Sequence, residues 1–154
     1  MTTTRLKLAA AVLLAAGIAV WLLVDKLGSE GKPHPLPWRD LTAQTGPLVL
    51  PREITREFIS RPQLAAYLHF RGGRRVPEID FPGWRGLLIS LGPRSSSAYS
   101  VRVLGVAEER DRVVVSVHRR NATLANPGRP RLTFPYRLIT LPTTGKPIHL
   151  HWVR

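Results

Sequence analysis

The stretch from Leu87 to Leu141 constrains the fold most strongly, because apolar and polar residues alternate through it at the two-residue period of a β-strand. Val101 and Val103 share one strand face, and the run from residue 112 to residue 118 repeats this pattern with three more valines. Strands of this kind bury one face and expose the other. The sequence therefore predicts a sheet with a packed face, built from short strands separated by turns.

Other segments extend this pattern in both directions. Leu87 to Leu91 is an almost uninterrupted apolar run, which favours a strand in the interior of a sheet. The charged residues 108–111 separate two strand patterns and so predict a hairpin. We expect strands at residues 38–41, 48–50, 87–91, 99–106, 112–118, 132–141 and 148–153, the last of which could instead trail off. Pro135 predicts an edge position or a bulge for the 132–141 strand, because proline lacks an amide donor.

One helix is predicted between Ser60 and Gly72-Gly73. Ser60 and Gln63 have the spacing of a capping box, and an apolar stripe follows, formed by Leu64, Tyr67 and Leu68. A helix of about ten residues needs a sheet face to pack on. The expected fold class is therefore mainly β or α+β, an antiparallel sheet or sandwich with one short packed helix.

Residues 1–27 have the features of an N-terminal signal-anchor, a transmembrane helix. Leu8 to Val24 is apolar without interruption, and Arg5 and Lys7 precede it. A helix of this length spans roughly 25 Å, a little short of the hydrocarbon thickness of a bilayer, and Leu6 and Lys7 could extend it at one end. The basic residues place the short N-terminal side in the cytoplasm and the rest outside. Cleavage and secretion are the alternative, but residues 25–29 lack the A-x-A-like site of a secretory signal, so we expect a single-pass protein of the cell membrane.

The rest of the chain divides into a Gly/Pro-rich linker, residues 28–37, and an extracytoplasmic β-rich domain, residues 38–154. The net charge of the protein is +13, and most of its basic residues are arginines. Outside the membrane, such a domain is expected to meet anionic lipid headgroups, wall polymer or an acidic protein partner rather than nucleic acid. Cysteine is absent, which excludes disulfides, thiolate catalysis and a lipidated cysteine anchor.

Several short motifs occur in a recognisable order between residues 36 and 142. They are Asp80-Phe81, Leu91-Gly92, Tyr99-Ser100-Val101 and Phe134-Pro135-Tyr136. In this order the chain resembles the PrcB-like family, named for an accessory subunit of a bacterial surface serine-protease complex, and specifically its C-terminal domain. The resemblance implies a secreted or membrane-tethered, non-catalytic β-rich domain that associates with another protein, with a protease as one candidate partner.

The predicted loop from Gly92 to Ser97 is one candidate binding surface, and an exposed strand edge is the other. The candidate binding residues are Arg94, Ser95, Ser96, Ser97 and Tyr99. The family usually has Gly-Gly before the tyrosine, where this chain has Ser97-Ala98. Because glycine allows backbone conformations that serine and alanine resist, the departure leaves the conformation of this loop open.

We expect no catalytic activity, no bound metal and no cofactor. The serines at 95–97 lie in neither a G-x-S-x-G nor an S-x-x-K pattern, and a serine run after Gly-Pro is first a turn signal. His149 and His151 could share one strand face, but no further ligand stands nearby in sequence. The expected function is a membrane-anchored, non-catalytic protein-interaction module, accessory to a surface protease complex. The alternative is a basic domain that binds anionic lipid headgroups or cell-wall polymer.

Overall fold

The computed structural model describes residues 32–153, and the predicted anchor at residues 1–27 lies outside them. In the described part, no helix is both long and apolar enough to span a membrane. Sheet A has the strand order β1-β6-β7-β10, with β1 (His34–Pro35), β6 (Ser100–Glu108), β7 (Val113–Arg120) and β10 (Ile148–Val153). Sheet B has the order β2-β9-β4-β3, with β2 (Arg39–Asp40), β9 (Tyr136–Pro142), β4 (Trp84–Leu91) and β3 (Glu53–Phe58). A small third sheet pairs β5 (Arg94–Ser96) with β8 (Pro130–Thr133), and the helices are α2 (Thr42–Thr45) and α3 (Arg61–Phe70).

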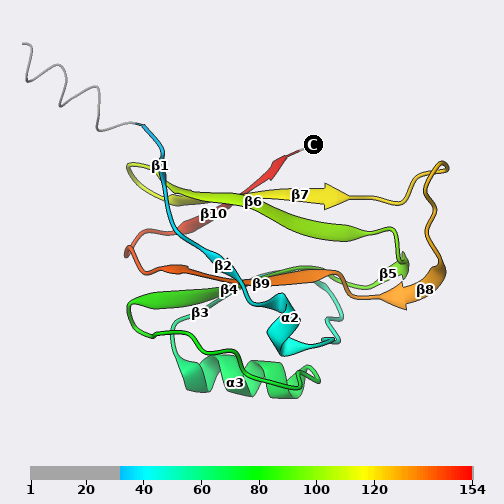
Figure 1. Ribbon diagram of the computed structural model, residues 1–154, viewed down its shortest axis with the longest axis horizontal. Helices are drawn as coiled ribbons and strands as arrows, with labels where there is room; N and C mark the ends of the chain where they lie inside the picture. Colours follow the sequence, from blue (N-terminus) through cyan, green and yellow to red (C-terminus); the bar gives the residue numbers. More distant parts are fainter. Residues whose placement is uncertain (1–31, 154) are drawn as a thin grey trace, which may run out of the picture. The chain divides into compact units, whose positions relative to one another are not determined.

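Sheets A and B lie one above the other, and α3 covers the outer face of sheet B (Figure 1). The core between the sheets contains the valines of β6 and β7 together with leucines and isoleucines of β4 and β9. A second core lies between sheet B and α3 and includes Phe58, Leu64 and Leu68. The mainly β class and the short packed helix are thus confirmed, in the form of a sandwich with a helix on one side.

Strand β4 belongs to both cores, which explains its uninterrupted apolar sequence. Leu87, Ile89 and Leu91 pack in the core between the sheets, while Leu88 packs in the core under α3. Alternate residues of a strand point to opposite faces, so a strand covered on both sides must be apolar throughout. The prediction of an interior strand is confirmed, since β4 lies between β9 and β3.

Two strand predictions were wrong. The run 132–141 is not one strand: it breaks at Phe134-Pro135 into β8 and β9, which belong to different sheets. Pro135 cannot donate to a neighbouring strand, but its carbonyl accepts a hydrogen bond from the amide of Leu91 at 3.0 Å. Strand β9 is an interior strand rather than an edge. The predicted strand at 48–50 is irregular, although Leu48 and Leu50 are buried.

The 99–106 and 112–118 patterns form the predicted hairpin, as β6 and β7. The 148–153 pattern forms β10, which pairs with β7 in parallel, unlike the antiparallel pairs of the rest of the sheet. At the start of α3, the Ser60 side chain makes no cap hydrogen bond, and Gln63 instead accepts from the amide of Ile59 at 3.1 Å. The predicted capping box is therefore not formed, because Gln63 bonds to the residue before the N-cap instead of to the amide of Ser60.

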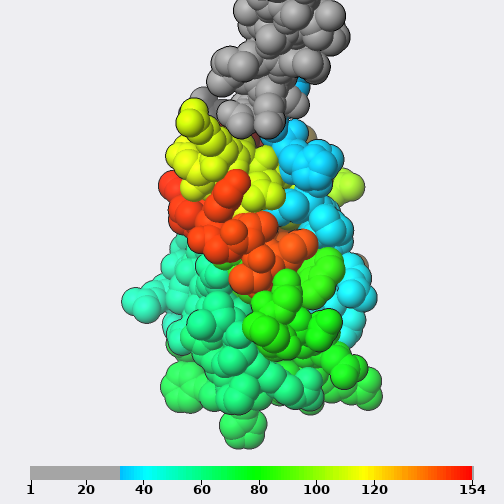
Figure 2. All heavy atoms as spheres, turned by 90° about the vertical axis from the view of Figure 1, so that its left-hand side faces the viewer, coloured from blue at the N-terminus to red at the C-terminus, as the bar shows by residue number. Residues whose placement is uncertain are grey.

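The segment 34–40 crosses from sheet A to sheet B, because β1 pairs with β6 and β2 pairs with β9. One side of the sandwich is therefore bridged by the chain. On the opposite side the edge strands are β10 in sheet A and β3 in sheet B, and we call it the open side. At the end of the sandwich seen in Figure 2, the β6–β7 turn (yellow) adjoins the segment before β10 (orange-red). Lys146 joins them through an ion pair with Glu108 at 2.8 Å.

Candidate functional site

The residues predicted to form a binding loop are mostly part of regular structure. Arg94, Ser95 and Ser96 form β5, and Arg94 lies opposite Thr133 of β8. The predicted loop therefore contains a short strand, because β8 supplies a partner that lies more than thirty residues away in sequence. The prediction of a loop at 92–97 was therefore correct only for residues 92–93 and 97.

Two of the three serine hydroxyls hold this region together. The Ser96 side chain is buried, donates to the carbonyl of Pro127 and accepts from the amide of Ala98 at 3.1 Å. The Ser97 hydroxyl accepts from the amide of Arg129 at 2.9 Å, and the Ser97 amide donates to the carbonyl of the same residue at 3.1 Å. Hydroxyls used in this way tie the chain to itself. Ser95 alone of the three is exposed.

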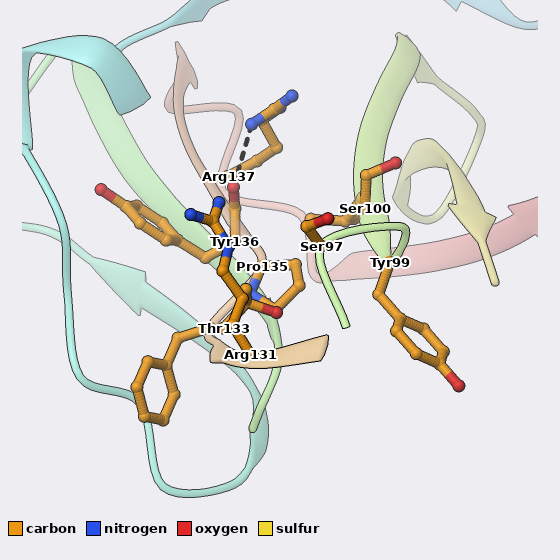
Figure 3. A pocket seen from close by; sticks show the side chains of 10 residues that line it. Ser97, Tyr99, Ser100, Arg131, Thr133, Pro135, Tyr136 and Arg137 are labelled. Carbon is orange, nitrogen blue, oxygen red and sulfur yellow. Dashed lines mark hydrogen bonds between the residues drawn. The ribbon is translucent and has the colours of Figure 1, made fainter. Parts of the chain in front are cut away.

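Arg94 and Tyr99 also interact within the domain. The Arg94 guanidinium lies 5.8 Å from the centre of the Tyr99 ring and forms an ion pair with Glu53 of β3 at 3.3 Å. The Tyr99 side chain is half-buried and turned away from the other labelled side chains in Figure 3. The two residues thus form one contact at the surface, where a partially exposed cation and ring favour each other modestly.

A groove of about 240 Å³ lies between the start of β6 and the segment that joins β8 to β9 (Figure 3). Of the five predicted binding residues, Ser97 and Tyr99 line it, while Arg94, Ser95 and Ser96 do not. The segment 131–137 supplies the other wall and with it two arginines, Arg131 and Arg137. The groove was not predictable from local sequence, because its two walls lie about thirty residues apart in the chain.

The charge of this groove comes from its two arginines. Arg137 forms an ion pair with Asp40 at 3.4 Å, whereas Arg131 takes part in no ion pair among residues 32–153. The Tyr136 hydroxyl does not add to this charge: it bonds to Thr45 and to the carbonyl of Gly46 in the second core, where burial raises its pKa above the ordinary value. The groove is therefore a shallow, hydroxyl-rich and cationic recess suited to a carboxylate or another small polar group.

Within residues 32–153, no hydrogen bond joins Ser95, Ser96 or Ser97 to a histidine. In that same part of the chain, no three His, Asp or Glu side chains are grouped as a metal site would require. His149 and His151 are both exposed and share the outer face of β10.

The open side of the sandwich carries a second recess, which sequence reasoning missed. Arg119 forms an ion pair with Glu53 of β3, and its guanidinium lies 4.7 Å from the centre of the Trp152 ring of β10. One arginine thereby links the edge strands of both sheets. A recess of about 500 Å³ adjoins it, lined by Arg119, Asn121, Trp152 and Val153. Trp152 is 37% exposed.

The two edge strands differ in how their edges are protected. The amide of Val113 in β7 donates to the carbonyl of Pro147, just before β10. Because alternate residues of a parallel strand turn their backbone groups to the neighbouring strand, those of His149 and His151 face β7, and those of Leu150 and Trp152 face away from it. Strand β10 reads IHLHWV, without lysine, arginine, acidic residue or proline. Strand β3 reads EITREF and carries three charged residues. Charges and prolines are the usual protection of an edge, so β10 is the unprotected one.

Comparisons of the chain with protein-family models, curated proteins and solved structures find no match.

Proposed function

We propose that this protein is a membrane-anchored, non-catalytic module of the extracytoplasmic space that binds another protein through the free edge of β10. The single observation that carries the proposal is this edge: among residues 32–153, no strand pairs with β10 on the side away from β7. The resemblance to the PrcB-like family favours a surface protease complex as the setting. The apolar run at residues 8–24 supplies the anchor in this proposal.

Binding by strand addition, in which an extended segment of the partner pairs with the edge of β10, would use both the edge and the recess beside it. An extended segment of the partner would hydrogen-bond to the outward backbone groups of Leu150 and Trp152. The recess beside Trp152 would then receive a side chain of that segment. Backbone pairing supplies affinity in this mode of binding, and the recess supplies the preference for one partner over another.

The charge of the domain favours an acidic partner. Arg119 and Arg120 lie at the end of β7, next to β10, and the net charge of the whole protein is +13. Two copies paired through β10 would bring these cations together, which costs free energy. Acidic residues flanking the partner's extended segment would instead speed association.

A membrane crosslinking experiment tests the proposal. The full chain carries a photoreactive amino acid in place of His151, which is exposed on β10 and whose side chain lies on the outer face of sheet A. The matched variant carries it in place of Ser95, the exposed residue of the predicted loop. We expect a protein adduct from position 151 and little from position 95.

Each other outcome has a definite meaning. Adducts from position 95 alone would place the contact at β5 and reject the edge of β10. An absence of protein adducts from both positions, in membranes where the anchored protein is folded, would reject the role in protein binding.

A further inference from the structure

The C-terminal end of α3 carries exposed apolar side chains among arginines. Phe70 is 77% exposed and Val49, from the segment before β3, is 57% exposed. We call this surface the α3 tip and define it as Val49, Phe70, Arg71, Arg74 and Arg75. Most of the tip belongs to or directly follows the C-terminal end of α3, the helix that covers the face of sheet B away from sheet A (Figure 1), and so the tip is distinct from the edge of β10.

Backbone hydrogen bonds hold the two segments of the tip together. The amide of Val49 donates to the carbonyl of Arg71 at 2.9 Å, and the amide of Arg74 donates to the carbonyl of Thr45 at 3.0 Å. Gly72, with a φ of +82°, turns the chain at the end of the helix. The apolar and cationic groups are therefore presented on one fixed surface.

In the part of the chain that the structure describes, no carboxylate forms an ion pair with an arginine of the tip. Residues 41–52 and 59–77 contain no aspartate or glutamate. None of the ion pairs within residues 32–153 includes Arg71, Arg74 or Arg75. The Arg71 guanidinium lies 4.9 Å from the centre of the Phe70 ring, which holds cation and aromatic ring side by side.

The combination of an exposed aromatic ring, an aliphatic side chain and unpaired arginines fits one class of partner. A soluble polyanion would use the arginines and leave Phe70 in water. An anionic bilayer surface uses both, since guanidinium groups meet lipid phosphates while apolar side chains enter the interface. We propose that the α3 tip docks on the surface of a bilayer rich in anionic phospholipid. The proposal goes beyond the protein-binding role and does not require it.

The absence of cysteine from the chain makes a site-specific test possible. Ala66 is exposed on α3, one turn before Phe70, and Leu124 is fully exposed in the connection between β7 and β8. The full chain, as Ala66→Cys or as Leu124→Cys, is labelled with an environment-sensitive fluorophore. Each is reconstituted into nanodiscs of phosphatidylcholine alone or mixed with phosphatidylglycerol. We expect a blue shift of the emission at position 66 in anionic discs only, lost at high salt, and none at position 124.

Two matched variants distinguish binding through the tip from binding through the net charge of the domain. The triple variant Arg71→Gln, Arg74→Gln, Arg75→Gln removes three charges from the tip. The variant Arg102→Gln, Arg110→Gln, Arg129→Gln removes three from exposed positions elsewhere. We expect the blue shift to disappear in the first and to persist in the second. Phe70→Ser should also abolish it, and circular dichroism checks that each variant is folded.

The following outcomes overturn the proposal. An equal shift in neutral discs shows that anionic lipid is not recognised. An equal loss in both triple variants shows that net charge alone drives the contact. A shift produced by soluble polyphosphate in neutral discs, unaffected by Phe70→Ser, assigns the surface to a dissolved polyanion instead of a membrane.

Discussion

The backbone amide of Val113 donates a hydrogen bond to the carbonyl oxygen of Pro147, 2.8 Å away, and this contact fixes the pairing of β10 with β7. In a parallel pair, alternate residues of each strand turn their backbone groups toward the neighbour. His149 and His151 are therefore bonded to β7, while Leu150 and Trp152 present backbone groups that no strand within residues 32–153 pairs with. The proposed binding surface follows from this alternation.

Amide hydrogen exchange should reproduce the alternation along β10. We expect the amides of Leu150 and Trp152 to exchange fast, because no hydrogen bond within residues 32–153 protects them. The amides of His149 and His151 should exchange slowly, since each bonds to β7. Residue-resolved exchange by NMR measures this directly, and four similar rates would mean that the edge is either covered or frayed.

The buried hydroxyl of Tyr136 should make stability depend on pH in the alkaline range. Burial raises its pKa in the folded state, so the folded protein holds this proton more tightly than the unfolded chain does. The contribution is complete below the unfolded pKa of about 10 and is lost as the pH rises through the higher folded pKa. Denaturant unfolding at a series of pH values should show this decline.

Two conservative variants test whether Tyr136 is responsible for that decline. Tyr136→Phe should reduce the alkaline loss and lower stability by about 1 kcal/mol at neutral pH, because Thr45 and the carbonyl of Gly46 lose a hydrogen-bond partner. Tyr99→Phe, at a half-buried position, should leave the alkaline loss unchanged. If the two variants had the same pH profile, the assignment to Tyr136 would be wrong.

Glycine at position 128 should be required by a close approach to β5. Its φ is +68°, and a Cβ there would lie 2.5 Å from the amide nitrogen of Ala98 and 2.6 Å from the hydroxyl of Ser96. Gly145 has a similar φ of +73° but no atom within 4 Å of that position. Gly145→Ala should thus cost only the backbone strain, about 1 kcal/mol.

Gly128→Ala adds steric overlap to the same strain, so it should cost about 2 kcal/mol more than Gly145→Ala. Thermal unfolding of both variants gives the comparison. Equal losses would indicate that the 127–129 segment can move away from Ser96 without penalty.

Local pattern was enough to predict those parts of the fold whose partners are close in sequence. The β6–β7 hairpin and α3 follow from the alternation of valines and from the stripe of Leu64, Tyr67 and Leu68. The apolar run of β4 predicted its position in the interior of a sheet. These features depend on what each segment buries, which its own sequence determines.

The parts that could not be predicted depend on distant pairing. Pro135 marks a break between strands of different sheets, and local sequence does not reveal which strands they join. The parallel pairing of β10 and the link from Glu53 through Arg119 to Trp152 connect residues far apart in the chain. Ser96 and Ser97, two of the predicted binding residues, hydrogen-bond to the segment 127–129, about thirty residues away in sequence, which local pattern does not reveal.

The most direct test of the proposed binding edge compares two proline substitutions in the full chain. Leu150→Pro removes an outward amide from β10, and Thr55→Pro removes an outward amide from β3, the other edge of the open side. The measurement is the yield of the photochemical protein adduct from position 151 in membranes. We predict that Leu150→Pro lowers this yield about tenfold and that Thr55→Pro leaves it unchanged. If folded Leu150→Pro protein gave the yield of the unsubstituted chain, the partner would not bind by strand addition to β10.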